Sequence, residues 1–157
     1  MSRVECGFLA DHPEAVPSVA RWLIDEWWPE KTKQAAEELV AALQQRASRD
    51  RAPIDLVAFI GDRVAGVATI KPHELSELFP DTPYWLGGVL VDPAQRGQGV
   101  AAALAEHAAN VARDVGIPAL HLQTEHLDGG LYAKHGWERW QEIEHEGSQR
   151  LVMRRVL

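Results

Sequence analysis

Residues 84–101, YWLGGVLVDPAQRGQGVA, decide how this chain folds. The apolar run at 84–91 predicts a strand, the Asp-Pro segment at 92–95 predicts a turn, and the glycines at 96–101 predict a loop. Apolar residues at helical spacing follow, and they predict a long helix through Leu104, Ala108, Val111 and Val115. The loop therefore meets a helix N-terminus, where unpaired N–H groups and the helix dipole favour an anion. Because glycine lets a bulky anion approach the backbone, we expect the loop to bind phosphate.

The glycine pattern alone does not identify the phosphate ligand. The lysine of a Walker A loop is missing, which argues against a nucleotide triphosphatase. Gly97-x-Gly99-x-x-Ala102 satisfies the loose dinucleotide fingerprint, but the loop lies past the middle of the chain. The fingerprint's acidic residue is expected about 20 positions on, and the acidic residue closest to that point, Asp114, falls inside the predicted helix instead of ending a second strand. A small dinucleotide-binding oxidoreductase remains an alternative.

Two sequence blocks together resemble the GNAT superfamily of acetyl-CoA-dependent N-acetyltransferases. Arg96-x-x-Gly99-x-Ala101 matches the cofactor loop of that family, Gln/Arg-x-x-Gly-x-Gly/Ala. Residues 131–137, LYAKHGW, are similar to its late element Leu-Tyr-x-Lys-x-Gly-Phe/Trp. The blocks stand in the family's order. The resemblance covers the second half of the chain, and the first half only by the order of strands and helices.

The remaining sequence predicts elements that agree with this resemblance. We expect strands at 4–9, 56–60, 64–71 and 119–124, and a terminal hairpin of 137–146 and 148–156 around Gly147. Helices are expected through Val19, Leu23 and Trp27, after a Thr32 cap, and around Leu131 with Asp128 as a candidate cap. The resemblance implies an α/β fold of the GNAT type. Its mixed, mostly antiparallel sheet would have about six to seven strands, flanked on both faces by about four helices, in a single domain over residues 1–157.

The resemblance also implies acetyl-CoA as the cosubstrate. In the family the fourth and fifth strands splay apart and admit the pantetheine arm, and a backbone N–H beside the arm stabilises the tetrahedral intermediate. The loop would bind the diphosphate. Arg96 has two interpretations, an ion contact to a phosphate or a surface residue that orients the loop. The expected cofactor-binding residues are Val89, Leu90, Val91, Arg96, Gly97, Gln98, Gly99, Val100 and Ala101.

Tyr132 is the catalytic candidate that the resemblance implies, as the acid that protonates the departing thiolate. Its alternative role is a half-buried aromatic that holds the short helix. A frequent family base is a glutamate on the fourth strand, but this chain has Trp85-Leu86-Gly87-Gly88 there. The base would then act through water or from a neighbouring loop, and the candidates are Glu26, His73, Glu74, Glu125 and His126.

The acceptor site is expected to include Glu26, Trp28, His73 and His126. Trp27 and Trp28 cannot both face the core from one helix, so one of them either lines a pocket or packs under a loop. Residues 25–29, DEWWP, look like a GNAT branch that includes acetyltransferases of peptide N-termini. The acceptor class stays open among a peptide or protein N-terminus, a lysine, a polyamine, an aminoglycoside and a small metabolite.

The composition disfavours membrane-spanning, secreted and nucleic-acid-binding proteins. No apolar stretch reaches the roughly 20 residues that cross a bilayer, and the N-terminus has no signal-peptide pattern. Cys6 is the one cysteine, which excludes an internal disulfide, and we expect it in a buried strand of a cytoplasmic protein. The formal net charge of −7 disfavours a nucleic-acid partner and suits cationic amines.

None of the seven histidines has zinc-site spacing, so we expect no metal and mostly surface histidines. The leading hypothesis is acetyl transfer to a primary amine by direct attack in a ternary complex, since no cysteine lies in the catalytic blocks. A non-catalytic acyl-CoA-binding module or sensor is the alternative. A homodimer is a further possibility that the family suggests.

Overall fold

The computed structural model describes residues 3–157, and its elements follow the predicted order. The first half holds β1 (Val4–Phe8), α1 (Val16–Trp27), α2 (Lys33–Gln45), β2 (Ile54–Ile60) and β3 (Arg63–Lys71). The second half holds β4 (Trp85–Val91), α3 (Val100–Asp114), β5 (Ala119–Thr124), α4 (Gly130–Ala133), β6 (Glu138–His145) and β7 (Ser148–Val156). Short 3₁₀ turns at Leu9–Asp11, Pro13–Ala15 and Pro93–Gln95 complete the chain.

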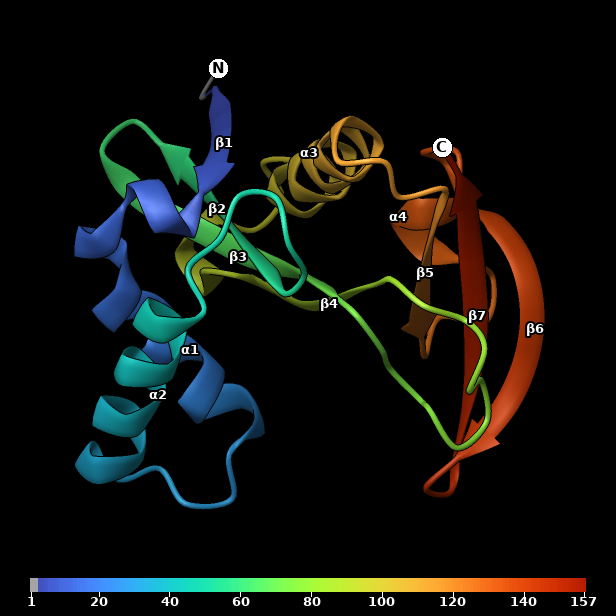
Figure 1. Cartoon of the computed structure of the whole chain (residues 1–157), viewed down its shortest axis with the longest axis horizontal. Helices are drawn as coiled ribbons and strands as arrows, with labels where there is room; N and C mark the ends of the chain where they lie inside the picture. The colour runs from blue at the N-terminus through green and yellow to red at the C-terminus, as the bar shows by residue number, and fades with distance from the viewer. Residues whose placement is uncertain (1–2) are drawn as a thin grey trace.

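The seven strands form one sheet in the order β1-β2-β3-β4-β5-β7-β6. All neighbours are antiparallel except β4 and β5, which are parallel. Helix α3 covers one face of the sheet, and α1 and α2 cover the other (Figure 1). The prediction of a mixed, mostly antiparallel sheet with helices on both faces is confirmed.

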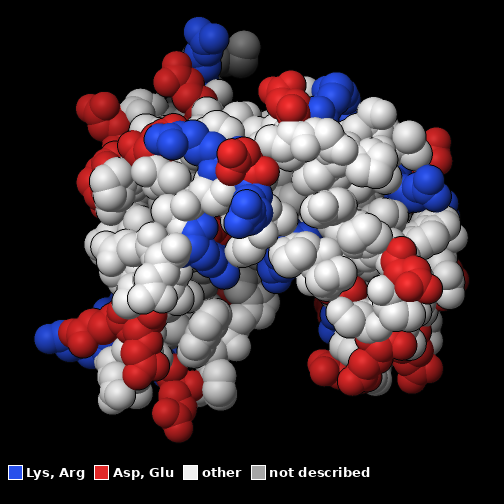
Figure 2. All heavy atoms as spheres, in the orientation of Figure 1, with Lys and Arg blue, Asp and Glu red and all other residues white. Residues whose placement is uncertain are grey.

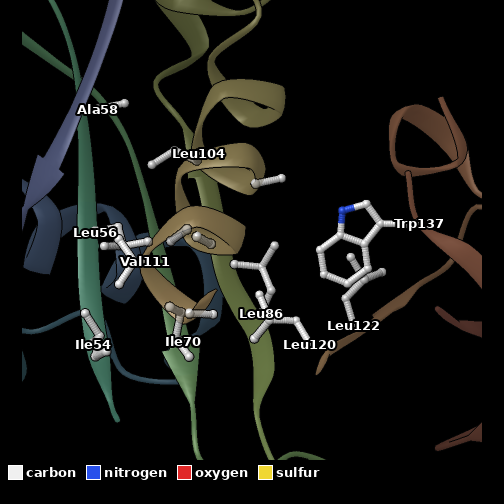
Figure 3. Packing of buried hydrophobic residues seen from close by; sticks show 14 of the residues in the cluster. Ile54, Leu56, Ala58, Ile70, Leu86, Leu104, Val111, Leu120, Leu122 and Trp137 are labelled. Atoms are coloured by element: carbon white, nitrogen blue, oxygen red, sulfur yellow. The ribbon is translucent and has the colours of Figure 1, made fainter. Parts of the chain in front are cut away.

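The core on the α3 face joins both halves of the sheet. Leu104 and Val111 of α3 pack with Leu56 of β2, Leu86 of β4 and Leu122 of β5 (Figure 3). All five of these side chains are buried, so this layer withdraws a continuous apolar surface from water. The core therefore holds β4 and β5 in one layer even where their backbones do not pair.

Strands β4 and β5 meet at a single point and then part. Their only ladder pair is Trp85 with His121, whose backbone N–H donates to the carbonyl of Tyr84 at 3.0 Å. Beyond Gly87, the edge of β4 that faces β5 has no ladder partner. A bulge lies in β4 at the same place, because two residues, Gly88 and Val89, oppose one residue of β3. Gly88 adopts a φ of +60°, which a side chain would disfavour.

Residues close in sequence set where most helices and strands begin and end. Thr32 caps α2 as predicted, with its hydroxyl accepting from the N–H of Ala35 at 3.0 Å. The predicted cap at Asp128 is only half right. Its carboxylate accepts from the N–H of Gly130 at 2.9 Å, but Gly129, with a φ of +88°, occupies the cap position itself. Leu9 is not a strand residue as expected, because it turns into the buried cluster beneath α1. Within residues 3–157, no helix is both long and apolar enough to cross a bilayer.

Candidate active site

The glycine-rich loop leaves an open cradle at the start of α3. Gly97 and Gly99 have φ angles of +79° and +81°, and a β-carbon at either position would meet no atom within 4 Å. Gly99 caps α3, and no side chain bonds to the first N–H groups of the helix. Asp92 turns the chain into the loop, because its carboxylate accepts from the N–H of Ala94 at 3.1 Å. The cradle therefore presents free donors at the positive end of a helix of 15 residues.

Two side chains of the loop have different surroundings. Gln98 donates to the buried Gln95 at 2.9 Å, which ties the loop to the preceding turn. Arg96 is exposed, and its side chain makes no hydrogen bond or ion pair with any residue of the described range 3–157. A role in orienting the loop would need such a contact. The arrangement favours a guanidinium that is free to meet an anion.

The parted strands continue this cradle toward the centre of the sheet. Val89, Leu90 and Val91 are half-buried, and their strand is unpaired on the β5 side. An unpaired strand edge offers N–H and C=O groups to an extended chain. The gap between β4 and β5 thus runs directly into the glycine-rich loop.

Tyr132 and Trp137 come from the chain after β5. Their rings meet edge to face with centroids 6.0 Å apart, and both contact the core on the α3 face. Burial raises the pKa of the Tyr132 phenol above its ordinary value, so the group keeps its proton at neutral pH. The indole N–H of Trp137 is buried without a hydrogen-bond partner, and Figure 3 shows the indole directed toward Leu86 and α3. Buried indole N–H groups are ordinarily paired, so this donor suits a bound group.

The other face of the sheet carries a polar bridge over the gap. A carboxylate oxygen of Glu74, in the loop before β4, accepts from the side-chain amide of Gln123 on β5 at 2.9 Å. Arg150 of β7 donates to the carbonyl oxygen of the same amide at 2.7 Å. The second carboxylate oxygen of Glu74 is buried and has no partner.

The family can now be assigned. Residues 19–137 match the model of the Acetyltransferase (GNAT) family, which is more than half of the chain. The chain belongs to the GNAT family. It is accordingly an acyltransferase, and both the cradle and the parted strands lie within the matched range or end at its border.

Several solved GNAT structures share this fold. YncA from Salmonella typhimurium, solved with its cofactor acetyl-CoA, is 17% identical with a TM-score of 0.73, over 98% of this chain and 94% of that one. An aminoglycoside 6'-acetyltransferase of type Ii is 18% identical with a TM-score of 0.71, over 97% and 96% of the two chains. An aminoglycoside 6'-N-acetyltransferase complexed with coenzyme A is 16% identical with a TM-score of 0.69, again over 97% and 96%. A search of curated proteins found no match.

No hydrogen bond or ion pair joins the four predicted acceptor residues, all of which lie in the described part of the chain. Glu26 and Trp28 are exposed at the end of α1, His73 is exposed just after β3, and His126 is exposed just after β5. Neither tryptophan of the pair packs into the core, since Trp27 is 51% and Trp28 36% exposed. Glu125, a candidate base, is exposed and accepts from the hydroxyl of Ser148 at 3.2 Å.

One histidine is an exception to the prediction of mostly surface histidines. His121 is buried with 6% exposure, and its ring lies 5.5 Å from that of Trp85 and 5.1 Å from that of Trp140. Burial lowers its pKa, so the ring is neutral near pH 7. His121 is buried because β5 turns it toward the aromatic cluster on the face opposite α3. No three of the His, Cys, Asp and Glu residues in the described chain are grouped to hold a metal.

Sequence reasoning missed the bridge between Glu74 and Gln123. Glu74 was one of several candidate bases, and nothing in the spacing singled it out. Gln123 was not a candidate at all, although the pattern of β5 places it on the same face as His121. Two cavities of about 340 and 220 Å³ lie elsewhere, one beside Cys6 and Phe59 and the other beside Leu43 and Asp55.

Proposed function

We propose that this GNAT protein transfers the acetyl group of acetyl-CoA to a primary amine by direct attack in a ternary complex. The observation that carries the proposal is the continuous path from the gap between β4 and β5 to the glycine cradle of α3. A thioester arm of extended shape fits the gap, and a diphosphate fits the cradle. Both features occur in one segment, residues 85–101, and coenzyme A carries both an extended pantetheine arm and a diphosphate.

Several groups of this chain fit the cosubstrate. Gly97, Gly99 and the first N–H groups of α3 would hold the diphosphate, with Arg96 as its side-chain partner. The free edge at Val89, Leu90 and Val91 would pair with the amide groups of the arm. An N–H of this edge would also bind the thioester oxygen as its charge develops. The unpaired indole N–H of Trp137 is a further donor on the α3 face.

Tyr132 would protonate the leaving thiolate. Its raised pKa keeps the phenol protonated until a strongly basic group needs the proton, and a thiolate in a partly buried site is such a group. Direct attack is favoured over an acyl-cysteine route by the position of Cys6. That thiol lies half-buried in β1, and burial raises its pKa to about 11, which removes the reactive thiolate.

The surface beside the gap favours a cationic acceptor. Figure 2 shows the molecule hollowed between the α1–α2 part and the β6–β7 hairpin, with acidic side chains on both parts and basic side chains at the head of the hollow. Asp25, Glu26 and Glu30 are exposed on the α1–α2 part, and Glu142, Glu144 and Glu146 are exposed on the hairpin. These carboxylates would attract a cationic amine. A polyamine or an aminoglycoside therefore suits the hollow better than an acidic peptide, and the two aminoglycoside enzymes of similar fold point in the same direction.

A thiol-release assay tests the proposal. Acetyl-CoA is incubated with spermidine, kanamycin, a dipeptide with a free N-terminus and a neutral primary amine, and released CoA is measured. We expect turnover with the cationic amines and a rise of their KM with salt. CoA should raise the melting temperature and NAD should not. Stabilisation by acetyl-CoA without turnover on any amine would favour the binding module, and no stabilisation by CoA would refute the cosubstrate. Sedimentation in the same buffer tests the predicted homodimer.

A further inference from the structure

We propose that Glu74 is the base that takes the proton from the acceptor amine, which rests on the proposed function. Glu74 lies outside β4, in the loop between β3 and β4. The structure brings its carboxylate over Gly87 of β4 and across the gap to Gln123 of β5. A loop side chain thereby supplies the carboxylate that this β4, with no acidic residue, lacks.

The space above Gly87 is what the carboxylate occupies. A β-carbon built on Gly87 would lie 2.5 Å from the Oε2 atom of Glu74, a separation that real contacts do not show. Leu86 points to the α3 face, so the side-chain direction at Gly87 is the opposite face, where the acceptor hollow lies. The carboxylate of Glu74 can therefore take this position only because Gly87 has no side chain.

Hydrogen bonds fix which oxygen is free. Arg150 can only donate, so the oxygen of the Gln123 amide must face Arg150 and its nitrogen must face Glu74. Glu74 thus uses Oε1 to accept from Gln123, while Oε2 is buried without a partner. Buried carboxylate oxygens are ordinarily hydrogen-bonded. An unpaired oxygen beside the gap is a free acceptor for the N–H of an amine bound there.

Glu74 and Tyr132 lie on opposite faces of the gap where the thioester would react. Gln123 lies two residues past His121, where β4 and β5 last pair, so the carboxylate lies across the gap just beyond the point of divergence. Tyr132 contacts the core on the opposite, α3 face. The thioester between the strands would then have the base on one side and the acid on the other.

The proton balance of the step is simple. Glu74 Oε2 accepts the proton that the amine nitrogen loses, and the nitrogen forms its bond to the thioester carbon. The carbon–sulfur bond breaks, its electron pair goes to sulfur, and the thiolate takes the hydroxyl proton of Tyr132. Solvent removes the proton from Glu74 and returns one to Tyr132. The products are the N-acetyl amine and CoA.

The test uses the full chain, acetyl-CoA and the amine of the panel with the highest turnover. Glu74→Gln keeps the shape and an oxygen for Gln123 but loses the basic oxygen, so kcat should fall about 10²- to 10³-fold. The Kd for CoA and the melting temperature should not change. Glu77→Gln is the matched control, because Glu77 is exposed in the same loop, and it should keep full turnover.

A second variant moves the carboxylate without changing its charge. Gly87→Ala places a methyl group where Glu74 Oε2 lies and beside the end of Lys71, and the far ends of these two flexible side chains give way at little cost. Its kcat should fall at least tenfold while the melting temperature and the Kd for CoA stay near those of the wild type.

Three results would overturn the assignment of Glu74. They are a Glu74→Gln enzyme within twofold of wild-type kcat, an equal loss in Glu77→Gln, and a loss matched by weaker CoA binding. A wild-type protein inactive on every amine of the panel would instead count against the proposed function itself.

Discussion

Gly66→Ala tests whether the packing under α3 sets the shape of the coenzyme cradle. Gly66 is buried in β3, and a β-carbon there would lie 2.7 Å from Val100 Cγ1, 2.9 Å from the backbone oxygen of Leu90 and 3.1 Å from Leu104 Cδ1. Ordinary contacts begin at 3.4 Å, so Val100 would have to move by about 0.7 Å. Val100 is the first residue of α3, and the Leu90 carbonyl belongs to the strand that would bind the pantetheine arm.

The expected magnitude follows from these contacts. Overpacking of this kind costs about 1 to 3 kcal/mol of unfolding free energy, which lowers the melting temperature by roughly 2 to 12 °C for a chain of this size. Loss of one charge-assisted hydrogen bond at the displaced helix end would cost about 1.5 kcal/mol, or about tenfold in the Kd for CoA. Urea unfolding and calorimetric titration of CoA measure the two effects.

Gly87→Ala is the control for the added methyl group. It also lies in a strand, but its new atom meets only the flexible ends of Glu74 and Lys71. Its unfolding free energy should stay within about 1 kcal/mol of wild type and its CoA affinity should be unchanged. If Gly66→Ala kept both wild-type stability and wild-type CoA affinity, the link between the sheet and the cradle would be refuted.

Four further outcomes are expected. Tyr132→Phe should lower kcat about 10²- to 10⁴-fold with an unchanged Kd for CoA. Because burial raises the pKa of the phenol, deprotonation of Tyr132 should not lower the wild-type rate between pH 7 and pH 9. Stopped-flow thiol release measures both, and a Tyr132→Phe enzyme of wild-type rate or a wild-type rate that falls in this range would contradict the role of Tyr132. Arg96→Ala should weaken CoA about tenfold in calorimetry and leave the binding of pantetheine, which lacks the diphosphate, unchanged. Asp55→Asn should cost about 2 to 3 kcal/mol in urea unfolding, because it breaks a two-point bond with Arg46 (2.8 and 2.7 Å) at a carboxylate that is 4% exposed, and a cost near zero would contradict this. Cys6, with its pKa raised to about 11, should react with iodoacetamide at pH 7.5 far more slowly than the free amino acid, and equal rates would show an accessible thiolate.

Short-range chemistry explains why the sequence predicted most of the fold. The Thr32 cap and the glycines at 97 and 99 act within a few residues, so their roles follow from spacing. The strand-loop-helix segment at 84–115 was predicted correctly for this reason. The parting of β4 and β5 followed from the family resemblance, because no residue pattern states where two parallel strands stop pairing.

Long-range contacts explain what the sequence did not predict. The Glu74–Gln123 bond joins residues 49 positions apart, and side-chain bonds of that span leave no periodic trace. The burial of His121 was not predicted for a related reason. Alternation in β5 sets its face, but only the folded chain brings Trp85 and Trp140 over that face. The bulge at Gly88 is likewise visible only in the pairing register with β3.

The two faces of the sheet differ where β4 and β5 part. Apolar side chains of Leu86, Leu122 and α3 pack together on one face, so this core holds the two halves of the sheet together. On the other face the polar bridge of Glu74 and Gln123 crosses the gap. Substitutions in the 72–84 loop or the β6–β7 hairpin can reshape the entrance for a new amine while the coenzyme seat keeps its form. Surface substitutions alone could therefore change which acceptor is used, without any change in the core.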